Sequence, residues 1–197
     1  MLLGLLTLVI VGFSPVTAWE GNGAHWTISN DVITHVPGGG DFISSEVFES
    51  FELSFDWKIA PGGNSGVFYR VNPDLGPAYE SGPEYQIVDN KGHSDGKNPL
   101  TSAGSAFGLY APARDLTRPA GAWNSGKIVV VGTHVEHWLN GEKILEFTMG
   151  SEDWLRRVAA SKFTAWPEFG TQASGHIVLQ DHGAEVMFRN VLVRVLP

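Results

Sequence analysis

Residues 175–194 read Gly-His-Ile-Val-Leu-Gln-Asp-His-Gly-Ala-Glu-Val-Met-Phe-Arg-Asn-Val-Leu-Val-Arg. Two stretches that alternate like β-strands flank a turn at Gly183, and three hydrogen-bonding side chains end the first of them. Because successive strand residues face opposite sides, we expect Gln180 and His182 to share one face and Asp181 to act as a structural anchor on the other. A plain structural hairpin needs no such polar run, so the stretch indicates a sheet with a working surface.

A second stretch has the same design. Residues 84–90 read Glu-Tyr-Gln-Ile-Val-Asp-Asn, which places Glu84 and Gln86 on one face of a strand and Tyr85 and Ile87 on the other. Two strands of this kind predict one sheet with an apolar face toward the core and a polar face toward a ligand.

The rest of the chain is rich in short alternating runs joined by glycine and proline turns, which is typical of β-sandwiches. The pair Asn140-Gly141 predicts a tight hairpin, because both central positions of a type I′ turn need positive φ. One short helix is expected around 151–162, capped by Ser151. Strands are predicted over residues 51–59, 66–71, 84–89, 106–110, 127–131, 134–139, 142–148, 176–181 and 184–195.

About ten strands and one helix, without a βαβ rhythm, predict an all-β fold: an antiparallel jelly-roll sandwich. We expect residues 19–197 to form a single domain. The long connection 90–105 is predicted to be a loop over one rim of the sandwich, where long loops are often functional.

Composition limits the possible partners. The formal net charge of −8 argues against nucleic acid, since no basic stripe could neutralise phosphates. The chain has no cysteine, so any metal must be held by His, Asp, Glu or Asn. Seven tryptophans are many for 197 residues, and aromatic rings commonly stack on sugars.

Residues 1–18 carry no charged side chain and are strongly apolar. They read as a signal peptide followed by a small-residue cleavage site, or as an apolar N-terminal strand. We therefore expect an exported, periplasmic or extracellular protein. The run is short for a membrane span, so the mature chain is expected to have none.

A series of short motifs carries a specific resemblance. In order along the chain they are Asn64-Ser65-Gly66-Val67 with Arg70, the stretch 84–90 with His93, Gly121-Ala122-Trp123-Asn124, the stretch 137–141, the stretch 175–183 and Phe188-Arg189-Asn190. Together they cover about residues 19–196, and the chain resembles the 3-keto-disaccharide hydrolase domain family.

The resemblance implies a jelly roll of the concanavalin A-like lectin and glucanase type. It also implies cleavage of glycosides already oxidised at C3, with a functional link to a sugar 3-dehydrogenase. A 3-keto group acidifies the C2 proton, so a base can remove that proton and the C1 substituent can leave, after which water adds. Such a site needs a base, an electrophile for the enolate oxygen and a proton donor for the leaving group.

Three residues are predicted to be catalytic: Glu84, Gln86 and His182. On residue type alone, a solvent-facing pair on an exposed sheet would explain Glu84 and Gln86, and a strand-end histidine is often only hydrogen-bonded. Predicted substrate-binding residues are Asn64, Arg70, Trp123, Asn124, Trp138 and Gln180. The alternatives are a turn at Asn64 and a surface ion pair at Arg70.

Asp89, His93 and Asp95 are predicted ligands for one divalent cation, which would polarise the ketone. Equally, Asp89 could start a turn and His93 could decorate a loop.

Two other functions remain open at this point. A carbohydrate-binding module would use the same sandwich without chemistry. A conventional glucanase would place two carboxylates roughly 5–10 Å apart across the cleft.

Overall fold

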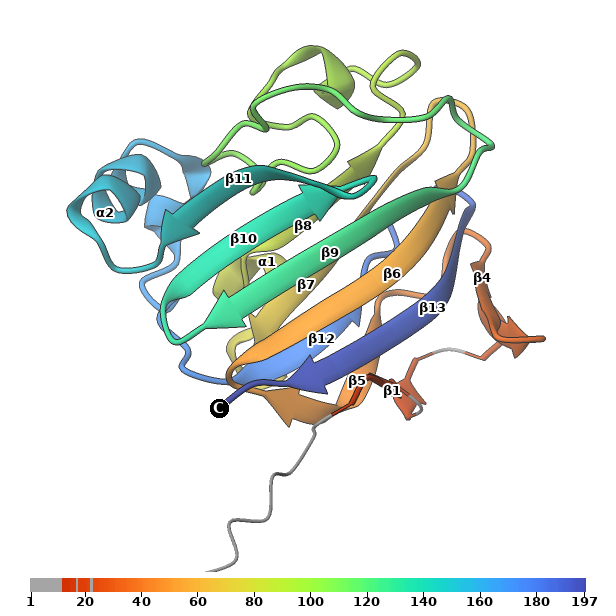
Figure 1. The fold of residues 1–197 in the computed structure, drawn as a ribbon, viewed down its shortest axis with the longest axis horizontal. Helices are drawn as coiled ribbons and strands as arrows, with labels where there is room; N and C mark the ends of the chain where they lie inside the picture. Colours follow the sequence, from red (N-terminus) through yellow and green to blue (C-terminus); the bar gives the residue numbers. More distant parts are fainter. Residues whose placement is uncertain (1–11, 17, 22) are drawn as a thin grey trace, which may run out of the picture.

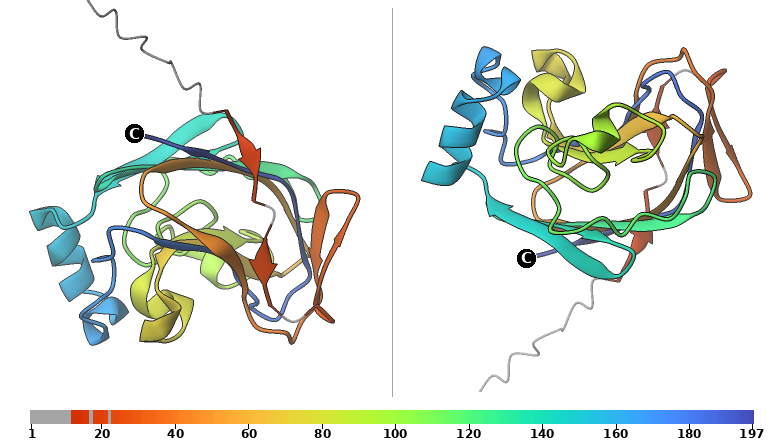
Figure 2. Two further views of the ribbon diagram at one scale, coloured as in Figure 1. Left: turned by 90° about the horizontal axis from the view of Figure 1, so that it is seen from below. Right: turned by 90° about the horizontal axis from the view of Figure 1, so that it is seen from above.

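The computed structural model describes residues 12–16, 18–21 and 23–197, and these form two stacked antiparallel β-sheets (Figure 1). Figure 2 shows the two layers edge-on, with the helices gathered at one side. The larger sheet has the order β11 (Glu142–Thr148), β10 (His134–Leu139), β9 (Asn124–Val131), β6 (Phe51–Ile59), β13 (Val186–Val195), β4 (Val32–His35) and β3 (Trp26–Ser29), and β1 (Ser14–Pro15) also pairs with β13. The smaller sheet has the order β2 (Trp19–Glu20), β5 (Phe42–Phe48), β12 (Gly175–Leu179), β7 (Asn64–Val71) and β8 (Glu84–Val88).

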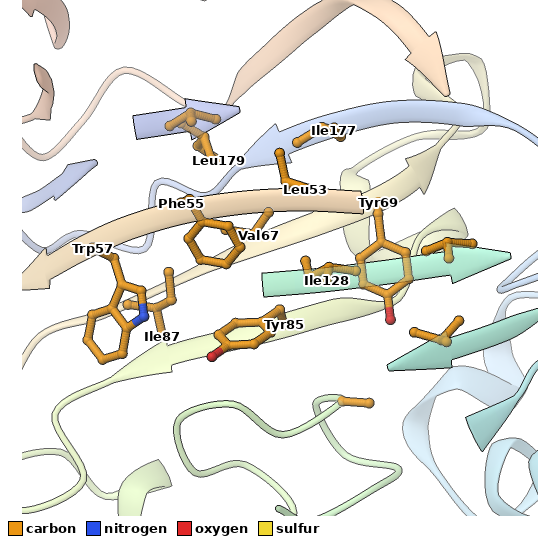
Figure 3. Packing of buried hydrophobic residues seen from close by; sticks show 14 of the residues in the cluster. Leu53, Phe55, Trp57, Val67, Tyr69, Tyr85, Ile87, Ile128, Ile177 and Leu179 are labelled. Carbon is orange, nitrogen blue, oxygen red and sulfur yellow. The ribbon is translucent and has the colours of Figure 1, made fainter. Parts of the chain in front are cut away.

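The core lies between the two sheets and follows from strict alternation. In β6, every second side chain from Phe51 to Ile59 is at most 2% exposed, while the intervening residues are half-buried. From the smaller sheet, Val67, Tyr85 and Ile87 point into the same layer (Figure 3). Each fully buried large side chain stabilises the sandwich by roughly 1.5–3 kcal/mol through removal of apolar surface from water.

Helices are few and short. Ser151 caps α2 (Glu152–Ala159) by accepting a hydrogen bond from the Trp154 N–H, as the sequence predicts. The four-residue helix α1 (Ala78–Ser81) was not predicted. Three 3₁₀ turns complete the set: η1 (Pro73–Leu75), η2 (Asp95–Lys97) and η3 (Lys162–Ala165). No helix in the described part of the chain is long and apolar enough to cross a membrane.

The predicted fold class, an antiparallel jelly-roll sandwich, is confirmed. The strands at 51–59, 134–139 and 142–148 have the predicted bounds. The strand predicted over 106–110 is wrong, because only isolated bridges form there and the segment turns back at Gly108. The sequence reading also missed β3, β4 and β5.

A bulge in β7 changes the direction of one predicted site residue. Phe68 pairs with Val178 and Val71 pairs with His176, so β7 has one more residue than β12 over this stretch. Arg70 takes φ +56° within it, outside the range of an ordinary strand.

The leader or first strand predicted over residues 1–18 lies mostly outside the described residues. Of that stretch, Ser14 and Pro15 form β1 against β13, and Val16 is buried in the core.

Candidate functional site

A pocket of about 290 Å³ lies on the outer face of the smaller sheet. Its floor comes from β8 and β7, because the side chains that alternate with the core residues Tyr85 and Ile87 point the other way. The loop after β8, η3 and the segment after β12 supply its walls. The residues that line it are Asp41, Asn64, Tyr79, Glu84, Gln86, Asp95, Phe107, Lys162, Gln180, Asp181 and His182.

Glu84 is the central acid of this pocket. It is only 8% exposed, and burial raises the pKa of its carboxyl to about 8, with Asp41 and Asp95 adding repulsion and Lys162 opposing it. Gly66 on β7 makes room for it, since a Cβ there would lie 2.2 Å from Glu84 Oε1. No hydrogen bond from a described residue reaches the carboxyl, which leaves it available to a ligand.

Three amide side chains around Glu84 have free acceptor atoms. Asn64 donates to Asp95 Oδ2 at 3.0 Å, and Gln86 donates to the Thr101 carbonyl at 3.2 Å. These contacts fix the two side chains, yet the buried oxygens Asn64 Oδ1, Gln86 Oε1 and Gln180 Oε1 accept no hydrogen bond within the described structure. Buried acceptors of this kind are costly unless a donor fills them, and sugar hydroxyls are such donors.

Asp181 is anchored by a loop of glycines. Its Oδ2 accepts hydrogen bonds from the backbone N–H groups of Gly38, Gly39 and Gly40 at 2.9–3.1 Å. Its Oδ1 lies 3.2 Å from His35 Nε2 and accepts a hydrogen bond from the Gly183 N–H. Although burial opposes it, these hydrogen bonds and the nearby His35 lower the pKa of Asp181 below its usual range. Asp181 is thus the structural anchor that the sequence suggests. The expectation that it points away from Gln180 and His182 is wrong, because β12 ends at Leu179 and all three residues line the pocket.

Asp41 adds a second carboxyl to this wall. It accepts a hydrogen bond from the Asp181 N–H at 2.9 Å, while burial raises its pKa above the usual range. The nearby His182 is exposed at the rim of the pocket.

Lys162 is the cation of the pocket. Its Nζ lies 4.5 Å from the ring centroid of Phe107, 5.3 Å from Phe163 and 5.9 Å from Tyr79. No carboxylate among the described residues lies within ion-pair distance of it. An ammonium group held by aromatic faces keeps its charge available for an oxygen of a ligand.

Arg70 does not reach the pocket. The bulge in β7 turns its guanidinium toward the edge of the sandwich, where Nη2 donates to the carbonyls of Glu49 and Gly132. The prediction that Arg70 binds substrate assumed regular alternation along the strand at 66–71, and the extra residue in β7 breaks that alternation.

Three further predicted substrate-binding residues lie at the larger sheet, one directly before β9, one on β9 and one on β10. Trp123 lies between Lys58 and Arg189, 5.1 and 4.2 Å from its ring centroid. Asn124 is 1% exposed and accepts hydrogen bonds from the Arg118 N–H and the Asn140 side chain. Trp138 packs under Lys127 and donates to Glu136. None of the three lines the pocket around Glu84, so the expectation that they share one site with Glu84 is wrong.

The predicted metal ligands do not converge. Asp89 accepts hydrogen bonds from the Gly62 and Lys91 N–H groups, so it organises a turn, and these bonds lower its pKa. His93 Nδ1 lies 3.7 Å from Asp95 Oδ2, and Asp95 alone of the three reaches the pocket.

Among the described residues, one set of three His and Glu side chains has its potential metal-ligand atoms within 4.8 Å of one another. This set lies on the larger sheet and consists of His134, Glu136 and Glu146. Lys143 already bridges its two glutamates there.

Sequence reasoning missed four residues of the pocket: Asp41, Tyr79, Phe107 and Lys162. Asp41 follows the triple glycine 38–40, a signal for a loop that binds an anion through its backbone. The other three come from segments that only the fold brings to β8, and we see no local signal that would have found them.

The comparisons with known proteins identify the family and support the fold. The model of the 3-keto-alpha-glucoside-1,2-lyase-like domain matches residues 13–194. A 3-keto-disaccharide hydrolase from Bacteroides thetaiotaomicron is 34% identical over 215 residues, covering 90% of this chain and 74% of that protein.

Solved structures show the same architecture. A candidate glycosyl hydrolase from Parabacteroides distasonis superposes with a TM-score of 0.86 at 32% identity, covering 94% of both chains. The β-glucanase of Bacillus licheniformis, 12% identical with a TM-score of 0.53 over 94% of this chain and 98% of that one, shares the fold alone and confirms the glucanase type of sandwich. On the family model and on the 34% identical relative, the chain belongs to the 3-keto-alpha-glucoside-1,2-lyase-like domain family.

Proposed function

We propose that this protein cleaves the glycosidic bond of 3-keto-glycosides in the pocket around Glu84. Family membership supports a carbohydrate-cleaving hydrolase, and the relative from Bacteroides thetaiotaomicron is named for 3-keto-disaccharides. The observation that carries the proposal is the buried carboxyl of Glu84, with its pKa raised to about 8, among unpaired amide acceptors and one lysine.

Glu84 is the base in this proposal. An ordinary carboxylate is a weak base toward a carbon acid, whereas a group whose pKa is near the working pH accepts a proton more strongly. The 3-keto group makes the C2 proton acidic enough for such a base. Gly66 leaves the carboxyl room beside the floor of the pocket.

Lys162 stabilises the enolate. When the C2 proton leaves, negative charge develops on the ketone oxygen, and an ammonium group within the pocket lowers the energy of that charge. Its aromatic neighbours hold it without neutralising it, which a carboxylate partner would do.

The remaining polar groups bind the sugar and protonate the leaving group. The free acceptor oxygens of Asn64, Gln86 and Gln180 receive sugar hydroxyls. His182 at the rim donates a proton to the leaving-group oxygen as the C1–O bond breaks and the C1=C2 bond forms. Water then adds its hydroxyl to C1 and a proton to C2, so the overall reaction is hydrolysis.

The decisive experiment compares a 3-keto-glucoside with its unoxidised parent. Release of the aglycone from the keto form only is expected. The Glu84→Gln variant should lose at least about a hundredfold in kcat/KM, the usual scale for a proton-transfer residue. Glu46→Gln, a change at an exposed glutamate of β5, is the matched control and should keep full activity.

Other outcomes select the other functions. Turnover of the unoxidised parent would favour a two-carboxylate glucanase, for which Asp41 lies in the same pocket as Glu84. Binding of both sugars without turnover of either would favour a carbohydrate-binding module.

Chelation tests the predicted divalent cation. Loss of turnover after dialysis against EDTA, with recovery on adding a divalent metal, would support a cation near Asp95. Undiminished activity would remove Asp89, His93 and Asp95 from the candidate ligands.

A further inference from the structure

A second groove, of about 420 Å³, lies at the end of the sandwich beneath α2. It shares no lining residue with the pocket around Glu84. Its wall is largely apolar: Trp154 and Phe169 are buried with their rings stacked at 5.8 Å, and Leu155 is 58% exposed. A volume of this size suits a small molecule.

Arg70 lies in the wall of this groove, and no carboxylate of the described residues is within ion-pair distance of it, although Glu49 lines the same groove. The residue is 4% exposed. Burial lowers the pKa of its guanidinium, with exposed Glu49 opposing that shift from a distance. Buried charges are normally paired, because an unpaired one loses its hydration without compensation.

The donor groups of Arg70 are only partly used. Nη2 donates to the carbonyls of Glu49 and Gly132, which fixes the plane of the guanidinium. Nε is buried without a hydrogen-bond partner, and Nη1 makes no hydrogen bond within the part of the chain that the structure describes. Because both hydrogens of Nη2 are already donated, Nη1 is the group left to donate a charge-assisted hydrogen bond to a carboxylate.

We propose that this groove binds a small amphipathic monocarboxylate, with the carboxylate on Arg70 and an aromatic or branched apolar body against Phe169 and Leu155. The ligand supplies the missing negative charge and covers the exposed leucine. A small inorganic anion would leave the apolar wall uncovered, and a neutral apolar molecule would leave the guanidinium unpaired.

The test is calorimetric titration with three probes: 3-phenylpropanoate, its amide and inorganic phosphate. We expect saturable binding of the carboxylate, with the amide and phosphate each at least about tenfold weaker. Equal binding of the amide or phosphate, or no binding of the carboxylate up to ~10 mM, would overturn the proposal.

Three variants test whether the carboxylate binds in this groove. Leu155→Glu adds a negative charge at an exposed position and should weaken binding of the carboxylate probe by about tenfold or more. Glu49→Gln removes a negative charge and should tighten that binding by about twofold. Val195→Glu, at a similarly exposed apolar residue outside the groove, should change nothing. Arg70→Lys alters the hydrogen bonds to the Glu49 and Gly132 carbonyls, so circular dichroism checks that this variant folds. Unchanged affinity in Leu155→Glu would refute the site.

Discussion

At the scale of single residues, the buried carboxyl of Glu84 gives the proposed reaction its pH dependence. Burial raises the pKa of this carboxyl to about 8, and only the ionised form can remove a proton. We therefore expect kcat/KM for a 3-keto-glucoside to rise with pH up to about pH 8. Rates measured from about pH 5 to 10 check this, and a profile already flat at pH 6 would show that Glu84 is not the base.

The same shift predicts an effect on stability. In the unfolded chain the carboxyl has a pKa near 4.5, so between about pH 4.5 and 8 the folded state holds a proton that the unfolded state has lost. The contribution of this carboxyl to the free energy of unfolding is fully present below pH 4.5 and is lost as the pH rises to 8. Glu84→Gln should thus match the wild type at pH 4 and exceed it at pH 9, by on the order of a few kcal/mol in the free energy of unfolding. Urea denaturation at both pH values measures the difference, which would be constant if Glu84 were exposed.

Gly66 offers a test of geometry without touching a polar group. An added Cβ would lie 2.2 Å from Glu84 Oε1, so Gly66→Ala should push the carboxyl aside and lower kcat/KM by about tenfold or more while the chain stays folded. Gly126→Ala is the contrasting variant, because its Cβ would lie 2.5 Å from the core ring of Phe55. We expect Gly126→Ala to lose stability, measured as a lower Tm. A folded Gly66→Ala variant with full activity would show that the reaction does not depend on the exact position of the Glu84 carboxyl.

At the scale of elements, the hairpin between β10 and β11 explains why Asn124 is structural. Asn140 and Gly141 form its turn at φ +49° and +89°, as the sequence predicts, and Asn140 Nδ2 donates to Asn124 Oδ1 at 2.9 Å. Asn124→Ala leaves the Arg118 N–H without its acceptor and removes one of the two acceptors of Asn140 Nδ2, which keeps the Leu116 carbonyl. The expected loss is about 1–3 kcal/mol in the free energy of unfolding, with an unchanged KM. A raised KM in a stable variant would show instead that Asn124 binds the substrate.

At the scale of the whole molecule, charge predicts selectivity. Four carboxyl groups and one lysine line the pocket of a chain with a formal net charge of −8. A 3-keto-glucuronide should therefore be cleaved about tenfold less efficiently than the matching 3-keto-glucoside, and salt should narrow the gap by screening. Competition kinetics at low and high ionic strength check this, and equal rates would mean that the carboxyls are neutral or turned away.

Local patterns predicted the parts of the fold that depend on alternation and turn chemistry. The bounds of β6, β10 and β11 and the capped α2 follow from side-chain period and from residues that favour one backbone conformation. The strand at 106–110 failed because an apolar run beside a glycine with positive φ can equally turn back on itself. Arg70 failed because one extra residue in β7 cancels the alternation on which its direction was inferred.

The sequence by itself determined the all-β class, the hairpin at Asn140-Gly141 and the shared face of Glu84 and Gln86, since each depends on neighbours along the chain. Only the tertiary structure decided which side chains meet. Lys162 of η3 lines the same pocket as Glu84 of β8, whereas Trp123 and Trp138 pack against cations on the other sheet. Contacts between residues far apart depend on how two sheets stack, and no local pattern encodes that.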